Sequence, residues 1–228
     1  MPPDEQRPTI AEDRAARRVT AASREQVKRE PPLLRFDKVE RVVHWTNASL
    51  FGILMLTGAA LYAGPISVLV GNREFVRGLH VYSGILLPIP LLIGIAGKRG
   101  ARLRVDLGRL NRWSHDDRRW FRRKQRAGVV LGKFNPGQKV NAAFIGGAAI
   151  VMLATGAIMK WFEPFPIDWR TGATFVHDWF ALGIWAAVLG HIWFALRDGD
   201  ALDSMIGGTG PAAWARKKAP LWYEELRP

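Results

Sequence analysis

Four histidines lie at the ends of apolar stretches, and imidazole is the commonest metal-binding side chain in proteins. His44 and His80 each open one stretch, while His177 and His191 bracket another and are 14 residues apart. That length of helix rises about 21 Å in close to four turns, so both would face nearly the same side at two depths. Ionisable residues inside a membrane are costly enough to indicate function. This pattern predicts two bis-histidine haem sites stacked across a bilayer.

The helices that must hold these histidines are predicted from the distribution of charge. Asp, Glu, Lys and Arg are absent from four stretches, which are residues 42–72, 78–97, 140–159 and 179–196. About 20 mostly apolar residues cross the hydrocarbon core, and helices satisfy their own backbone there. We therefore expect an all-α fold, an integral membrane four-helix bundle holding the two haems. Its predicted spans are residues 43–64, 79–97, 140–160 and 175–196.

The positive charge of the chain is concentrated in the two terminal segments and in the connection between the second and third spans. The formal net charge is +13, with ten Lys or Arg before His44, fourteen in residues 98–139 and five from Arg197 onward. The two remaining connections hold only four. With four spans, the basic regions lie on one side, which the positive-inside rule makes cytoplasmic. We expect both termini in the cytoplasm, basic residues that meet lipid headgroups and water, and no nucleic-acid partner.

The chain is expected to form one membrane domain with two flanking segments. We expect residues 1–33 to form an N-terminal cytoplasmic extension, flexible or bound to a partner, because charge of both signs and several prolines occur there. Residues 34–197 would form the four-helix domain, and residues 198–228 a C-terminal cytoplasmic tail. The sequence has no cysteine. Disulfides and thiolate-bound clusters in this chain are thereby excluded, so any iron–sulfur cluster must belong to a partner.

Topology also pairs the histidines by depth. The first span runs outward, which places His44 near the cytoplasmic face, and the second returns, which places His80 near the outer face. The fourth span also returns, so His177 lies outside and His191 inside. The predicted pairs are His44 with His191 and His80 with His177. For any one histidine an interfacial, hydrogen-bonded side chain is an equally good reading, but four in two depth classes favour ligands.

Glycines and prolines in the spans fit this reading less specifically. Gly84 and Gly183 should lie near the faces of His80 and His191, where a macrocycle needs flat surfaces. Small residues equally mediate ordinary packing between membrane helices. Pro88 and Pro90 should kink the second span and could open room between the helices.

Charged residues near the bundle ends have two readings. Arg41, Arg77 and Lys139 flank the bundle, where they would either pair with haem propionates or anchor the helices at the interface. His115 lies in the basic connection beside two aspartates and is expected to be a solvated residue, not a ligand.

The chain resembles a known family, the cytochrome b (gamma) subunit of membrane-bound formate dehydrogenase, within the wider family of bacterial di-haem membrane cytochromes b. The similarity runs from about Leu34 to Leu226. It is carried by the motifs ERVVHW at 40–45, RGLH at 77–80, GKFNPGQK at 132–139, TG at 155–156 and MIGG at 205–208. The resemblance implies four helices and two b-type haems, with electrons passing from an iron–sulfur subunit to a membrane quinone. The four histidines match the family's axial ligands and give the same pairs.

The resemblance also implies a quinone site near the cytoplasmic haem. The family's quinone loop corresponds to Asn135, Gly137 and Gln138, whose amides and bare backbone can offer hydrogen bonds to a quinone carbonyl. The alternative is a polar loop in which Asn135 caps the third helix.

We expect the membrane-anchor cytochrome b subunit of a respiratory formate dehydrogenase in the bacterial cytoplasmic (inner) membrane. Its partners would be an iron–sulfur subunit and the catalytic formate dehydrogenase subunit. The chain shows no site for formate oxidation, so its own contribution would be quinone reduction. The rivals are the cytochrome b of a hydrogenase or other respiratory enzyme, and a haem-free membrane transporter or scaffold whose histidines bind a transition metal.

Overall fold

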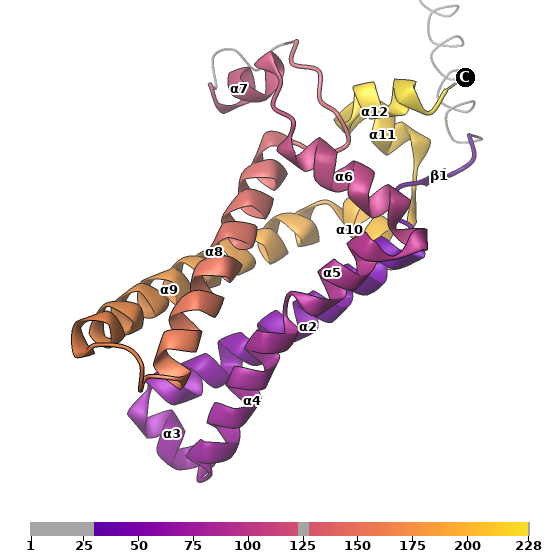
Figure 1. Cartoon of the computed structure of the whole chain (residues 1–228). Coiled ribbons are helices and arrows are strands. Elements are labelled where there is room, and N and C mark those ends of the chain that lie inside the picture. The colour runs from indigo at the N-terminus through magenta and orange to yellow at the C-terminus, as the bar shows by residue number, and fades with distance from the viewer. Residues whose placement is uncertain (1–29, 123–127, 228) are drawn as a thin grey trace, which may run out of the picture.

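The structure, a computed structural model, describes residues 30–122 and 128–227, so most of the extension predicted for residues 1–33 lies outside it. The bounds of the described elements are β1 (Leu33–Leu34), α2 (Lys38–Tyr62), α3 (Gly64–Val70), α4 (Arg73–Leu86), α5 (Ile89–Ala96), η1 (Lys98–Gly100), α6 (Ala101–Asn111), α7 (His115–Phe121), α8 (Pro136–Lys160), α9 (Ile167–Arg197), α10 (Gly199–Gly207), β2 (Thr209–Gly210), α11 (Ala212–Lys218) and α12 (Pro220–Glu225). Figure 1 shows long helices forming the body, with α6, α7, α10, α11 and α12 gathered at one end and the short helix α3 at the other.

Four helical segments among the described residues are long and apolar enough to cross a membrane. They are α2, α4 together with α5, α8 and α9, with lengths of 25, 24, 25 and 31 residues. The expectation of four spans is confirmed, but the helices begin earlier than predicted: α2 at Lys38, α8 at Pro136 and α9 at Ile167. A charge-free stretch marks only the part inside lipid, whereas a helix continues to its cap.

The second span is broken in its middle, as its prolines predict. α4 ends at Leu86 and α5 begins at Ile89, with Leu87 and Pro88 between them. Pro90 has no N–H to donate to the carbonyl of Leu86, and its ring would clash with that carbonyl in a regular helix. The expected kink at this position is therefore confirmed.

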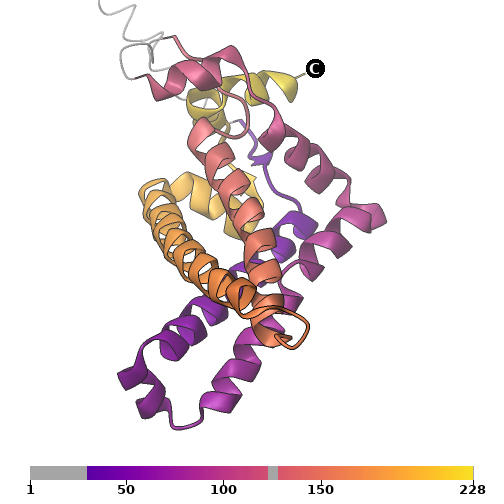
Figure 2. The same ribbon diagram turned by 60° about the vertical axis from the view of Figure 1, so that its left-hand side comes forward.

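The spans associate as two helix pairs. α2 packs against α4, and α8 packs against α9. Figure 2 shows each pair as a separate hairpin, with α2 and α4 running to the turn at α3. Only 6% to 17% of the apolar window of each span is buried inside the protein. Contacts of the helices with one another thus bury only a small part of the spanning segments.

The basic connection and the C-terminal segment fold together as a cap on one end of the bundle. β1 pairs antiparallel with β2, with Leu33 opposite Gly210. α11 and α12 contribute a small core that includes Trp214, Trp222 and Tyr223. Tyr223 donates its hydroxyl hydrogen to Glu30 at 2.8 Å, which joins the two ends of the described chain. The cap lies at the end of the bundle where α2 begins and α9 ends (Figure 1), which are the parts of these helices that carry His44 and His191.

A buried arginine stabilises this cap. Arg35, which follows β1, is 2% exposed, and its guanidinium lies 4.0 Å from the ring centre of Trp214. Burial lowers the pKa of Arg35 to about 10, against the attraction of Asp198 and Asp106. The residue therefore remains a cation at neutral pH, and a cation over an indole face is a favourable contact.

Candidate functional site

The inner pair of histidines joins the two helix pairs at the capped end. His44 of α2 and His191 of α9 have ring centres 6.1 Å apart, with an angle of 61° between the ring planes. Trp45, the neighbour of His44, donates its indole N–H to the carbonyl of Met205 in α10 at 3.2 Å. The cap thus fixes the rotation of α2 next to the ligand candidate.

The outer pair repeats this geometry at the other end of α9. His80 of α4 and His177 of α9 have ring centres 6.3 Å apart and planes at 63°. Each pair takes one histidine from α9 and one from the opposite helix pair. The structure therefore brings together the same partners that the topology predicts.

The separation of both pairs is the one that a shared metal requires. A ring nitrogen lies about 1.1 Å from its ring centre, and a metal–imidazole bond is about 2.0–2.1 Å long. Two imidazoles on opposite sides of one metal therefore have centres about 6.2–6.4 Å apart. The separations of 6.1 and 6.3 Å between the ring centres lie close to this range. Two side chains that met only by direct hydrogen bonding would lie closer.

The ligand sets fit a haem better than a bare metal ion. Among the described residues, no group of three or more His, Cys, Asp or Glu side chains could hold a metal. Two imidazoles alone leave a transition metal with too few ligands, since protein sites usually supply three or four. A porphyrin supplies four nitrogens in a plane, so two axial imidazoles complete its iron. The residues present at each site thus fit a bis-histidine haem.

Two threonines that sequence reasoning passed over contact the outer histidines. Thr57 Oγ1 lies 2.9 Å from Nδ1 of His80, and Thr155 Oγ1 lies 2.9 Å from Nδ1 of His177. The only signal in the sequence is that each threonine precedes a glycine and a histidine follows 23 and 22 residues later. Both hydroxyls leave the other ring nitrogen, Nε2, available to the site.

The glycines that approach the histidines are the ones after these threonines. A Cβ added at Gly58 would lie 3.3 Å from Cε1 of His80, and one at Gly156 would lie 3.6 Å from Cε1 of His177. Gly84 instead faces Leu54, and Gly183 faces Phe144 at 3.0 Å. The latter two support the helix-packing reading that the sequence left open.

The three cations considered for haem propionates differ in their partners. Arg77 pairs with Glu74 at 2.9 Å, and Lys139 pairs with Asp117 at 2.7 Å. Arg41 donates one N–H to the carbonyl of Ile206 at 2.6 Å, while its Nε is buried without a partner in the described part of the chain. A free donor near the inner pair makes Arg41 the best supported of the three.

The loop considered for quinone forms the cap of α8. Asn135 Oδ1 accepts the backbone N–H of Gln138 at 3.0 Å, and Gln138 Oε1 accepts that of Asn135 at 2.9 Å. This capping box uses both side-chain acceptors. Within residues 30–122 and 128–227, neither NH₂ group has a hydrogen-bond partner, so both remain as donors. A Cβ at Gly137 would lie 3.3 Å from Asn135 Oδ1 and 3.6 Å from Trp120.

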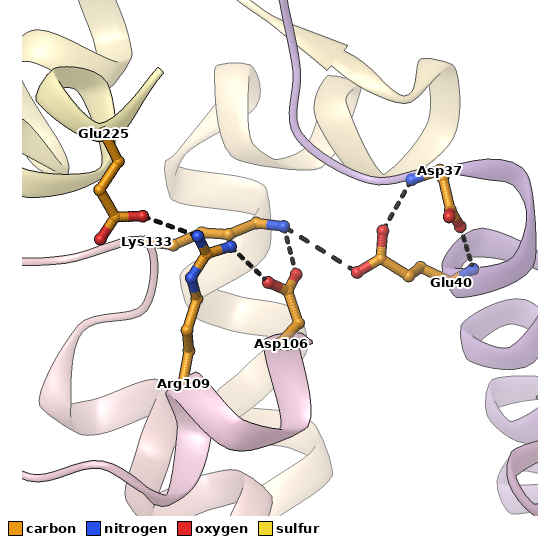
Figure 3. A network of polar contacts seen from close by, with 6 residues as sticks. All are labelled: Asp37, Glu40, Asp106, Arg109, Lys133 and Glu225. Atoms are coloured by element: carbon orange, nitrogen blue, oxygen red, sulfur yellow. Dashed lines mark hydrogen bonds and ion pairs between the residues drawn. The ribbon is translucent and has the colours of Figure 1, made fainter. Parts of the chain in front are cut away.

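A buried ion network links this loop to the helix of His44. Figure 3 shows Lys133 between Asp106 of α6 and Glu40 of α2, with Arg109 bridging Asp106 to Glu225 of α12. Lys133 lies 3.9 Å from Glu40, and the two side chains are 4% and 5% exposed. Burial lowers the pKa of Lys133, and the neighbouring Asp106 opposes this shift. The network connects α2, α6, the loop and α12 to one another at the end of α2 that carries His44.

His115 lies apart from both pairs. It is exposed at the first residue of α7, whose N-cap is Ser114. The basic connection forms α6 and α7, for which no prediction was made from the sequence. Neighbouring Asp117 is buried, which would raise its pKa, yet hydrogen bonds from Lys139 and Ser114 outweigh burial and hold that pKa below its usual range.

Four apolar helices with two histidine pairs at two depths define a membrane cytochrome b. A sequence model of the prokaryotic cytochrome b561 family matches residues 35–208, which is most of the chain and includes both histidine pairs. The protein belongs to this family and is an integral membrane protein.

Individual relatives are similar along nearly the whole chain. The cytochrome b556(fdo) subunit of formate dehydrogenase from Escherichia coli strain K12 is 26% identical over 219 residues, which cover 88% of this chain and 96% of the relative. The formate dehydrogenase cytochrome b556 subunit of Haemophilus influenzae is 24% identical over 221 residues, covering 89% and 87%. The nitrate-inducible cytochrome b556(Fdn) subunit of E. coli K12 is 24% identical over 200 residues, covering 85% and 91%.

Proposed function

We propose that this chain is the membrane-anchor, di-haem cytochrome b subunit of a formate dehydrogenase in the bacterial cytoplasmic membrane. Haem, when bound, supplies reversible one-electron transfer. The chain's own residues hold two such groups at fixed depths, so that electrons from an iron–sulfur subunit reach membrane quinone. The catalytic subunit that oxidises formate belongs to the same complex.

The observation that carries this proposal is the pair of histidine separations. Both pairs are spaced for one metal, at 6.1 and 6.3 Å, and both draw a ligand from the single helix α9. One pair alone would fit a single-haem protein or an isolated metal site. Two pairs stacked along one membrane helix make a conducting path across the bilayer. The relatives, all formate dehydrogenase cytochrome subunits by name, supply the substrate of the complex.

Orientation follows from charge. Fourteen Lys or Arg lie in residues 98–139, which contain α6 and α7 at the capped end. The positive-inside rule puts that end in the cytoplasm. His44 and His191 are then the inner ligands, His80 and His177 the outer ones, and both termini are cytoplasmic.

Haem content tests the central claim. The purified chain should show b-type absorption bands on reduction and about two haems per chain in a pyridine haemochrome assay. His80→Ala or His177→Ala should remove the outer haem and keep the inner one, and His44→Ala or His191→Ala should do the reverse. His115→Ala is the matched control and should keep both. A folded protein without haem would contradict the proposal and favour a metal transporter or scaffold.

The identity of the complex needs a separate test. The chain should co-purify with an iron–sulfur subunit and a large formate-oxidising subunit. In isolated membranes, formate should reduce its haem absorption bands, and hydrogen gas should not. Reduction by hydrogen alone would assign the chain to a hydrogenase and leave the cytochrome assignment intact.

The quinone site is proposed at the capping box at the N-terminus of α8, where Asn135 and Gln138 each present an unused amide donor. Asn135→Asp and Gln138→Glu keep the acceptor oxygens that cap the helix but remove these donors, so they separate quinone binding from helix capping. Each lost hydrogen bond should weaken quinone binding about twofold to tenfold. Haem reoxidation by quinone should slow while haem content and thermal stability stay unchanged. Normal reoxidation in the double variant would remove the loop from the site.

A further inference from the structure

The outer histidines are each held by a buried threonine. Thr57 and Thr155 are both 8% exposed, and each hydroxyl oxygen lies 2.9 Å from Nδ1 of its histidine. The two contacts come from different helix pairs: α2 serves His80 of α4, and α8 serves His177 of α9. The same threonine–histidine contact thus occurs in both helix pairs, which indicates a shared role.

The direction of these hydrogen bonds follows from the one proton of a hydroxyl group. Thr57 Oγ1 also lies 2.6 Å from the carbonyl oxygen of Ile53, and Thr155 Oγ1 lies 2.8 Å from that of Val151. A carbonyl can only accept, so each hydroxyl donates its proton to its own helix. Each threonine oxygen therefore accepts a hydrogen bond from the imidazole, which must carry its proton on Nδ1. Nε2 of both histidines is then unprotonated.

We propose that Thr57 and Thr155 are positioning residues that fix the tautomer of His80 and His177 and lower the reduction potential of the haem bound between them. Two unprotonated nitrogens cannot hydrogen-bond to each other, whereas both can bind one metal. The separation of 6.3 Å between the ring centres is right for that. This inference rests on the proposed function, because it concerns the haem of the outer site.

The arrangement is specific to the outer site. Gly58 and Gly156, next to the threonines, let each helix approach the edge of its imidazole. Within the described residues, no hydroxyl group is bonded to His44 or His191. The inner site thus serves as an internal reference in the same molecule.

The expected effect concerns the balance between ferric and ferrous iron. A hydrogen bond from the outer nitrogen of a ligating histidine makes the imidazole a stronger donor. A stronger donor stabilises ferric iron over ferrous iron and lowers the reduction potential. Replacing the hydroxyl by a methyl group should raise the potential of the outer haem. We expect about a twofold to tenfold shift of the reduction equilibrium per bond, where tenfold equals 59 mV for one electron.

The test compares two double variants by optical redox titration of the purified protein. Thr57→Val with Thr155→Val removes both hydroxyls with little change in shape. The matched control is Thr171→Val with Thr174→Val, because these α9 threonines donate only to carbonyls of their own helix, each at 3.0 Å. The step of the titration that belongs to the outer haem is assigned from the His44→Ala protein, which should retain that haem alone. Thr57→Ser with Thr155→Ser restores the hydroxyls.

We expect the outer haem's potential to rise in the valine variant, return in the serine variant, and stay fixed in the control. The inner haem's potential should not move. If the valine variant loses the outer haem, retention in the serine variant supports the same role. Unchanged potentials in the valine variant with both haems bound would overturn the inference. Loss of the outer haem from both the valine and the serine variant would also overturn it. Wild-type protein without any haem would contradict the proposed function instead.

Discussion

Gly58 should be intolerant of a side chain because His80 occupies the space next to it. In Gly58→Ala, the new Cβ would lie 3.3 Å from Cε1 of His80. Carbon atoms prefer about 3.5–4.0 Å, so the ring must shift by a few tenths of an ångström. Cε1 lies between the two ring nitrogens, and the shift therefore moves the metal-binding Nε2 as well. Thr57 holds the ring by its other nitrogen and resists the movement.

The magnitude follows from the size of this overlap. Overpacking of a close contact costs about 1–3 kcal/mol, and a shift this small belongs at the lower end. A loss of about 1 kcal/mol weakens binding of the outer haem about fivefold. Alanine also favours the helix by about 0.5–1 kcal/mol over glycine, which acts on folding and not on the haem.

Gly156→Ala is the matched control for this prediction. It has the same change in helix propensity, but its Cβ would lie 3.6 Å from Cε1 of His177, an ordinary contact. The assay is the rate of haem transfer from the purified protein to excess apomyoglobin. Gly58→Ala should release the outer haem about fivefold faster than Gly156→Ala, with equal rates for the inner haem. Equal release of the outer haem by both variants would refute the steric argument.

Three further outcomes are expected at the capped end. Lys133→Met removes the cation between two buried carboxylates and should lower the free energy of unfolding by about 3 kcal/mol, measured by thermal denaturation in detergent. Asp117→Asn should destabilise the protein at neutral pH. Because the pKa of Asp117 is lowered, its ionised pair with Lys139 stabilises the fold above the usual carboxyl pKa, and this advantage over the variant should vanish as pH falls through the lowered value. His115→Cys should react with an impermeant maleimide only in inside-out vesicles, and labelling of intact cells would reverse the orientation.

The sequence predicted the large features of this fold because hydrophobicity alone governs them. Four charge-free stretches became four spans, and the parity of crossing directions was enough to pair His44 with His191 and His80 with His177. Neither prediction requires knowledge of how one helix turns against another.

Contacts between neighbouring helices were beyond the reach of the sequence. Thr57 and Gly58 touch His80 only because α2 and α4 meet at one particular rotation and height. The periodicity of a single helix does not fix that register. For the same reason, Gly84 shares a face with His80 but packs on Leu54. The cap was also missed, since its cohesion comes from Lys133 and a few aromatic side chains, not from a long apolar pattern.

The continuity of α9 makes the distance between the two proposed haem sites a property of one helix. His177 and His191 belong to the same unbroken helix of 31 residues. Lipid thickness, loop length and partner binding cannot change their spacing without breaking that helix. Inserting one residue between them would turn one ligand by about 100° away from its partner, whereas seven residues would restore the face and lengthen the gap by about 10.5 Å. In the proposed di-haem cytochrome, the distance that an electron crosses between the two haems is thus fixed by one continuous helix.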